Sequence, residues 1–286
     1  MTHMAAPAED RYFSVDGLRL HGRLWRGGAR TPVICLPGLT RNERDFSDFA
    51  PSVAASGRDA LALSLRGRGL SDRDPAYLNY QPPTYVGDAL AALDQMAWEK
   101  AVFVGTSLGG IVTMLTNLAA PSRVAAAVIN DVGPELAPEG IARIAGYVGV
   151  KRSEARSLDE AAEQIRAVNE PAFPGRDLAF WRPFAERTFA KTGDGRWVLD
   201  YDQAIGRALV EAGPAGDLWP AFSSLNGKPT LIVRGAISDL LTTPIVEKMR
   251  AAVPGLKAVD VAGVGHAPTL SEPEAARAIK EFLAAV

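Results

Sequence analysis

Short apolar runs alternate along the chain with longer stretches in which apolar residues recur every three or four positions. The short runs predict buried strands, and the longer stretches predict amphipathic helices. The predicted strands cover residues 11–15, 18–25, 32–36, 60–65, 101–105, 124–130, 230–234 and 258–261, and the predicted helices cover residues 45–56, 84–98, 244–253, 272–286 and a segment that begins at residue 107. Such alternation requires right-handed crossovers and gives a mostly parallel sheet with helices on both faces. The first two strands flank Asp16-Gly17, a two-residue hairpin turn, so the sheet is expected to begin antiparallel.

The alternation stops between residues 135 and 222, where helical patterns and loop signals occur without a clear buried strand. Strand and helix alternation then resumes. This pattern predicts one α/β core domain, formed by residues 1–134 and 223–286, and a helical cap domain inserted at residues 135–222.

Composition excludes several classes of partner. The 286 residues include 31 basic and 33 acidic side chains in mixed order, so charge gives no reason to expect a nucleic acid or an anionic membrane. No window has the roughly 18–20 apolar residues that a membrane-spanning helix needs, and the start of the chain does not read as a secretory signal. The single cysteine, Cys35, excludes an internal disulfide and lies in an apolar run typical of a buried strand. We therefore expect a cytoplasmic protein, monomeric or homodimeric, with a small neutral or apolar ligand and no cofactor or metal.

One predicted strand leads directly into Gly105-Thr106-Ser107-Leu108-Gly109-Gly110, and an apolar helix follows. This order of strand, sharp turn and helix is typical of a nucleophilic serine whose hydroxyl is raised above the sheet. Glycine is expected at positions 105 and 109 because strand and helix approach too closely for a side chain. The alternative is a plain glycine-rich turn. Neither glycine pattern of a phosphate-binding loop is present.

A serine hydroxyl needs a base near it, and histidine is the natural candidate. Of the three histidines, His3 lies at the start of the chain and His21 lies in the second predicted strand, where a structural role is expected. His266 follows the last predicted strand through a flexible turn, at the edge where open α/β sheets place their ligands. We therefore predict His266 as the base.

The histidine in turn needs a carboxylate to fix its tautomer. Asp239 follows the strand at residues 230–234 and is predicted for this role. Asp131, which ends the strand at residues 124–130, is the alternative and otherwise serves as a turn residue before Gly133.

The developing oxyanion needs backbone N–H donors that are fixed in advance. The amide of Leu108, at the start of the helix after Ser107, is one predicted donor. The other is the amide of Leu39, in the turn Pro37-Gly38-Leu39-Thr40 after an early strand.

These segments occur in the order seen in the α/β-hydrolase family, which the chain resembles: Pro37-Gly38-Leu39, Arg66-Gly67-Arg68-Gly69-Leu70-Ser71-Asp72, the turn around Ser107, Ser238-Asp239 and Gly265-His266. The resemblance implies an α/β-hydrolase fold, with a mostly parallel eight-stranded sheet flanked by helices, an antiparallel second strand and a helical cap inserted after the sixth strand. Many members carry a histidine where this chain has Pro37.

The nucleophile limits the reaction. Dehalogenases and epoxide hydrolases of the family use a carboxylate, so Ser107 favours acyl transfer to water, with a carboxylic ester or lactone as substrate. Carbon–carbon hydrolases of the family also use serine, but they often carry an aromatic residue after the histidine, where this chain has Ala267. A cofactor-free perhydrolase, which uses the same triad, and a noncatalytic ligand receptor are also compatible with the pattern.

Several cap residues are candidates for substrate binding. Tyr147, Trp181 and Trp197 are predicted to line an apolar acyl pocket, although each of them can instead pack within the cap. Arg41 and Arg44 follow the predicted Leu39 donor and are interpreted as a solvated helix start or as contacts to a substrate carboxylate. Arg66 and Arg68 are interpreted as turn packing.

Overall fold

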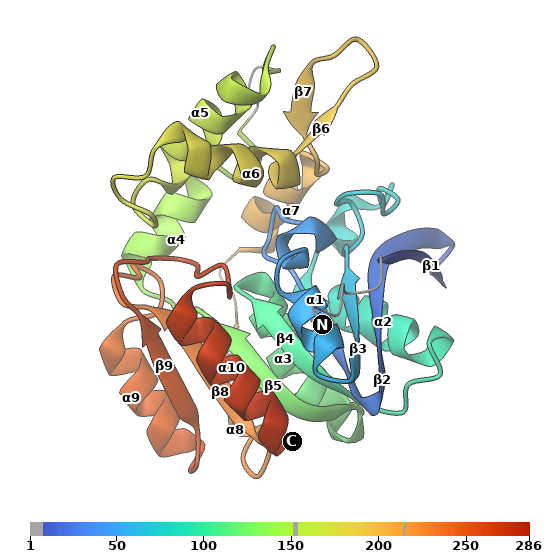
Figure 1. Cartoon of the computed structure of the whole chain (residues 1–286), viewed down its shortest axis with the longest axis vertical. Coiled ribbons are helices and arrows are strands. Elements are labelled where there is room, and N and C mark those ends of the chain that lie inside the picture. Colours follow the sequence, from blue (N-terminus) through green and yellow to red (C-terminus); the bar gives the residue numbers. More distant parts are fainter. Residues whose placement is uncertain (1–7, 151–153, 214–215) are drawn as a thin grey trace, which may run out of the picture.

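The fold is a single large sheet covered by helices, with a further group of helices at one end (Figure 1). A computed structural model describes residues 8–150, 154–213 and 216–286, so His3 lies outside the described residues. The strands of the large sheet are β1 (Glu9–Val15), β2 (Leu18–Leu36), β3 (Arg58–Leu63), β4 (Ala101–Thr106), β5 (Val124–Asn130), β8 (Thr230–Gly235) and β9 (Lys257–Val261). The order β1-β2-β4-β5-β8-β9, with β3 also paired to β2, gives the predicted arrangement: an antiparallel start followed by parallel strands.

The sheet has seven strands in the described part of the chain and not the expected eight, because two predicted strands are continuous. Residues 18–25 and 32–36 both belong to β2, which is 19 residues long. Residues 22–25 pair antiparallel with β3. Residues 33–35 pair with residues 60–62 of the same strand, and here the residue numbers of the two partners rise together. β2 therefore occupies two places in the sheet, one on each side of β3.

Helices cover both faces of the sheet. They are α1 (Ala50–Ala55), α2 (Pro82–Gln95), α3 (Leu108–Ala119), α9 (Thr243–Ala252) and α10 (Pro273–Ala285), with short 3-10 turns at Glu43–Phe46, Tyr77–Asn79 and Pro121–Arg123. Alternate residues of each central strand enter different clusters: Val33, Val102 and Val128 pack with α1 and α10, whereas Ile34 and Phe103 pack with α2 and α3. This alternation is what a strand buried on both faces requires. Cys35 is fully buried, as predicted, and burial raises the pKa of its thiol.

Residues 135–222, which we call the cap segment, lie between β5 and β8. They contain α4 (Pro138–Ala145), α5 (Leu158–Asn169), α6 (Leu178–Thr188), α7 (Ala204–Ala212) and α8 (Trp219–Ser223), and a small hairpin of β6 (Phe189–Lys191) and β7 (Trp197–Leu199) that the sequence pattern did not predict. Helices α4 to α7 gather above one end of the sheet, whereas α8 packs against α3 beside the core (Figure 1). The division into core and cap domains at residues 134 and 223 stays a prediction.

Within the described ranges, none of the helices combines the length and apolar character needed to cross a membrane.

Candidate active site

Ser107 stands at the sharp turn between β4 and α3, as predicted. Its backbone has φ 52° and ψ −114°, the strained left-handed region expected at such a turn. A Cβ atom added at Gly109 would lie 2.0 Å from the carbonyl oxygen of Leu36, and one added at Gly105 would lie 2.2 Å from the carbonyl oxygen of Gly109. Both glycines are thus required by the close approach of strand and helix.

His266 meets Ser107 from the loop after β9. Its Nε2 lies 3.0 Å from the Oγ of Ser107, and the residue is 9% exposed. The N–H of Gly265 donates to the carbonyl of Ala172 in the cap segment at 2.7 Å. Asn130 Nδ2 donates to the carbonyl of Pro268 at 2.8 Å. The loop that carries the imidazole is therefore held from the cap segment and from β5.

Asp131 occupies the other side of the imidazole. His266 Nδ1 lies 2.9 Å from Asp131 Oδ2, which also accepts a hydrogen bond from the hydroxyl of Ser238 at 2.6 Å. Asp131 Oδ1 accepts from the N–H of Gly235 at 2.7 Å, and the residue is 0% exposed. Ser107, His266 and Asp131 therefore form one continuous hydrogen-bonded chain, in which Nδ1 donates to the carboxylate and Nε2 is left to accept from the serine.

The structure does not bring Asp239 to the histidine, and the prediction for this residue needs correction. Its two carboxylate oxygens accept from Nε and Nη2 of Arg143 on α4, at 2.6 and 2.8 Å. The turn after β8 closes through the bond from Ser238 N–H to the Gly235 carbonyl, which presents Ser238 to Asp131 and turns Asp239 toward the cap segment. The hydrogen bonds from Arg143 hold the pKa of Asp239 below its usual range.

The two predicted oxyanion donors lie next to the nucleophile. Leu108 is the first residue of α3, so its N–H has no acceptor within the helix. A Cβ atom added at Gly38 would lie 3.9 Å from the Cβ of Ser107, which places the turn that carries Leu39 beside the serine. In the described part of the chain, neither amide donates to another backbone or side-chain acceptor. Both are thus available to a substrate oxygen.

The three cap residues predicted to bind substrate differ in their placement. Tyr147 is half-buried and lies within electrostatic range of Arg41, Arg143 and Asp239, and burial raises its pKa. It therefore faces the core domain near the site.

Trp181 is instead 0% exposed and packs against other aromatic rings of the cap segment, namely Phe173, Phe180 and Phe184. Trp197 lies in the small hairpin, half-buried, with Lys191 Nζ 6.0 Å from its ring. Trp181 therefore stabilises the cap segment itself and does not line a substrate pocket, because sequence periodicity cannot distinguish the inside of a small helical cluster from its lower surface. The substrate-binding role of Trp197 stays a prediction.

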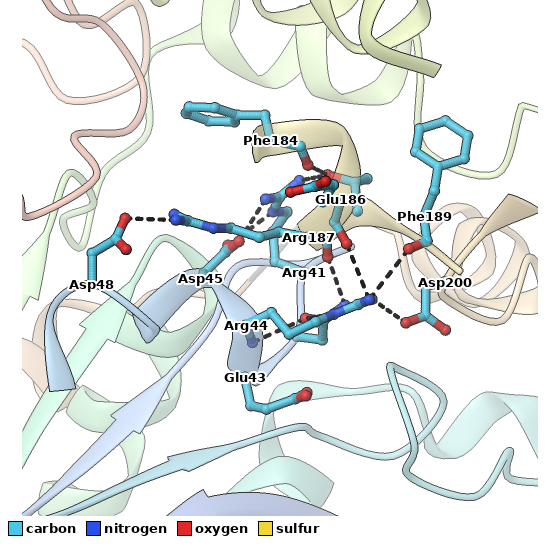
Figure 2. Close-up of polar contacts among 12 residues, drawn as sticks. Arg41, Glu43, Arg44, Asp45, Asp48, Phe184, Glu186, Arg187, Phe189 and Asp200 are labelled. Carbon is cyan, nitrogen blue, oxygen red and sulfur yellow. Dashed lines mark hydrogen bonds and ion pairs between the residues drawn. The ribbon is translucent and has the colours of Figure 1, made fainter. Parts of the chain in front are cut away.

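Arg41 and Arg44 have a role that the sequence analysis missed. Figure 2 shows both side chains extending from the loop after β2 to the end of α6 and the hairpin that follows it. Arg44 Nη1 donates to the carbonyls of Glu186 and Phe189 at 3.1 and 3.2 Å, and its Nη2 pairs with Asp200. Arg41 binds Asp45 and donates to the hydroxyl of Thr188. These arginines therefore bind the core to the cap segment, and neither is a solvated helix start.

The described residues hold no group of three or more histidine, cysteine or acidic side chains placed to bind a metal ion.

Comparison with known proteins agrees with this fold. Residues 33–279 match the model of the alpha/beta hydrolase family, and the chain belongs to that family. It is 32% identical over 250 residues to the 3-hydroxybutyrate-oligomer hydrolase of Cupriavidus necator, with 84% of each chain covered. It is 26% identical to esterase YbfF of Escherichia coli, over 88% of this chain and 93% of that protein. A crystal structure of an alpha/beta hydrolase from Novosphingobium aromaticivorans has a TM-score of 0.91 and 44% identity, and covers 99% of this chain and 100% of that one. The family and these hydrolase relatives identify the chain as a hydrolase.

Proposed function

We propose that the chain is a serine hydrolase that cleaves a carboxylic ester or lactone through an acyl-enzyme on Ser107. The observation that carries the proposal is the hydrogen-bonded chain from the Ser107 hydroxyl through His266 to the buried carboxylate of Asp131. Serine, histidine and aspartate in this order define a nucleophile, its base and the group that orients the base.

The proposed reaction follows from that order. Ser107 Oγ attacks the carbonyl carbon while its proton moves to His266 Nε2, and the N–H groups of Leu39 and Leu108 donate to the oxyanion. His266 then gives the proton to the leaving alkoxide, which departs as an alcohol. A water molecule attacks the acyl-enzyme and transfers a proton to Nε2, and collapse of this second intermediate releases the acid and returns the proton to Ser107. Asp131 holds the Nδ1–H tautomer and stabilises the imidazolium throughout.

Relatives suggest which esters to test first. The 3-hydroxybutyrate-oligomer hydrolase shares 84% of its length with this chain. We therefore propose short linear esters of hydroxy acids as the favoured substrate class, and simple alkyl esters as usable model substrates.

The test combines turnover with labelling of the nucleophile. Wild-type protein and Ser107→Ala are compared on short-chain p-nitrophenyl esters, on dimers and trimers of 3-hydroxybutyrate, and on a dienoate ring-fission product. We expect the wild type to hydrolyse the esters and a fluorophosphonate to modify Ser107. The Ser107→Ala variant should be inactive and folded.

Three results would overturn the proposal. Ester turnover by Ser107→Ala within a few-fold of the wild type would place the nucleophile elsewhere. Faster turnover of the dienoate than of every ester would favour the carbon–carbon hydrolase, despite Ala267 after the histidine. No labelling of Ser107 together with tight ligand binding would favour a receptor.

We further propose a core domain with an inserted cap at residues 135–222 and a cytoplasmic location. The protein is proposed to act as a monomer or homodimer on a small molecule, without nucleic acid or membrane.

A further inference from the structure

Arg68 is a fully buried cation beside the turn that carries the Leu39 amide. Its Nε and Nη2 both donate to the carbonyl oxygen of Leu39, at 3.0 and 2.9 Å. Its Nη1 donates to the carbonyl of Arg66 at 2.6 Å and to the hydroxyl of Tyr85 at 2.9 Å. In the described ranges it forms no ion pair with a carboxylate. Half of its hydrogen bonds thus go to a single peptide carbonyl.

The sequence around Arg68 makes this placement possible. Gly67 and Gly69, on its two sides, have φ values of 76° and 55°, which a residue with a side chain rarely adopts. A Cβ atom at Gly67 would lie 2.7 Å from the ring of Tyr80, and the guanidinium Cζ lies 4.7 Å from the centre of the Tyr85 ring. The two glycines let the loop turn sharply enough to direct the arginine inward.

The carbonyl that Arg68 holds belongs to a tight turn. The N–H of Arg41 donates to the carbonyl of Gly38 at 3.1 Å, which closes a four-residue turn with Leu39 and Thr40 at its centre. In such turns the central peptide, here the one between Leu39 and Thr40, is the unit that rotates when one turn type changes into another. Arg68 binds the oxygen of that peptide, and the Arg41 amide binds the oxygen of the preceding peptide, which carries the Leu39 N–H.

We propose that Arg68 is a positioning residue: its two-pronged hydrogen bond to the Leu39 carbonyl holds the turn in the form that directs the Leu39 amide at the oxyanion. This inference rests on the proposed serine hydrolase activity. A donor that is already fixed in place does not have to reorganise when the oxyanion forms, so the clamp stabilises the transition state more than the bound substrate.

Burial of a charged side chain at this position costs hydration free energy, so simple filling of space does not explain an arginine here. A buried cation without a carboxylate partner has lost its hydration, and an apolar side chain of similar volume avoids that loss. The planar guanidinium differs from a lysine ammonium because it offers parallel N–H groups to one acceptor. The contacts of Arg68 use that property at Leu39 and at no other residue.

The experiment compares Arg68→Met and Arg68→Lys with the wild type. For the folded variants we measure kcat and KM on a short-chain p-nitrophenyl ester and the rate at which a fluorophosphonate modifies Ser107. We expect Arg68→Met to lose about 10- to 100-fold in kcat and in labelling rate, because loss of one oxyanion donor costs about 100- to 1,000-fold and a mobile donor is a partial loss. KM should change by less than about threefold. Arg68→Lys keeps the charge but lacks the parallel donors, so it should lose an intermediate amount.

Tyr85→Phe is the matched control, because it removes the hydroxyl that Arg68 Nη1 contacts and leaves the bonds to Leu39 in place. Its kcat should stay within about threefold of the wild type. A folded Arg68 variant with wild-type kcat and labelling rate, a change confined to KM, or a Tyr85→Phe loss equal to that of Arg68→Met would overturn the proposal. Failure of both Arg68 variants to fold would also reject it, since Arg68 would then be a structural residue. If Ser107 is not labelled even in the wild type, the proposed function itself fails.

Discussion

Asp131 has hydrogen-bond partners on both of its carboxylate oxygens and no contact with solvent. The amide of Gly235 and the hydroxyl of Ser238 fix the carboxylate before the histidine approaches it. Asp239, the residue after Ser238, is part-exposed and paired with a cation of the cap segment. Only the first of these two environments suits an acid that must keep the orientation of an imidazole.

We therefore predict that Asp131→Asn lowers kcat far more than Asp239→Asn. An asparagine amide at position 131 can donate to His266 Nδ1, which moves the imidazole proton to Nε2 and removes the acceptor for the Ser107 hydroxyl. The comparable change in a serine protease costs on the order of 10,000-fold in kcat. Asp239→Asn should cost less than about tenfold. Steady-state kinetics on one ester, with thermal melting to show that both variants fold, decides between them, and a larger loss for Asp239→Asn would restore that residue as the acid.

The sequence predicted the contact between Ser107 and His266, but it favoured Asp239 where the structure places Asp131 beside the histidine, for a geometric reason. The turn around Ser107 carries its own glycine pattern, and His266 lies in an edge loop with few competing histidines. Asp131 and Asp239 follow β5 and β8, which are neighbours in the parallel sheet, so both carboxylates start from the same edge. Which of the two carboxylates reaches His266 depends on how the turn after β8 closes, and the residue pattern does not predict this.

The glycines of the turn around Ser107 also affect stability, because strand and helix approach closely there. Gly109→Ala should destabilise the fold by at least about 2 kcal/mol, because its Cβ would lie 2.0 Å from a backbone oxygen of Leu36. Gly87→Ala is the matched control. It lies exposed within α2, no atom lies within 4 Å of an added Cβ, and alanine should stabilise the helix by about 0.5–1 kcal/mol. Urea unfolding of both variants measures the difference, and equal effects would contradict the close packing of α3 against the end of β2.

Among the helices and strands, the sequence pattern predicted the positions of the strands of the large sheet well. It predicted less well where elements begin and end. The predicted helix at residues 45–56 is a 3-10 turn at Glu43–Phe46 followed by α1, whose first turn contains Pro51. Proline favours the first turn of a helix and disfavours its interior, so the helix starts there and not at residue 45. Strands 18–25 and 32–36 are continuous because a strand can bend at Gly27 and Gly28 without ending, which alternation of apolar and polar residues does not reveal.

The ion pair that joins α4 to the turn after β8 should contribute to stability in a pH-dependent way. Arg143 on α4 binds Asp239 after β8, and this bond lowers the pKa of the carboxyl. A lowered pKa in the folded state means that the pair stabilises the fold above the carboxyl's unfolded pKa of about 3.9 and stops doing so as the pH falls through the lower folded pKa. Wild type should thus exceed Asp239→Asn in unfolding free energy by about 1 kcal/mol at pH 7, and by progressively less below about pH 4.

Urea unfolding from pH 7 down to the lowest pH at which both proteins fold tests this dependence. Arg143→Met supplies the control background, in which Asp239→Asn should have little effect at any pH, since the partner is already gone. A constant difference from pH 7 to pH 3 would show that the pair contributes nothing that depends on ionisation of Asp239.

Across the whole chain, one short loop carries a proposed oxyanion donor and also attaches the cap segment to the sheet. Residues 38–48 carry the Leu39 amide next to Ser107, and they also carry Asn42, whose side chain donates to the carbonyl of Arg187 at 2.9 Å. Figure 2 shows that Arg44 reaches the same part of the cap segment from this loop. The cap segment is also bound on the side of Asp131, by the ion pairs of Arg143 with Asp239 and of Glu135 with Lys248. The loop from residue 38 to residue 48 therefore supplies the attachment on the side of the proposed oxyanion site.

Hydrogen exchange measures how far this attachment depends on a single side chain. Arg44→Met removes donors to the carbonyls of Glu186 and Phe189 and the ion pair with Asp200, and hydrogen bonds to a charged group contribute about 1.5–3 kcal/mol each. Amides in residues 186–200 should exchange at least about tenfold faster, while those of β4 and β5 keep their protection. Arg182→Met, which breaks a pair with Asp159 inside the cap segment, should leave residues 186–200 unchanged. Faster exchange throughout the central sheet in Arg44→Met would mean that the arginine stabilises the whole fold and not this junction.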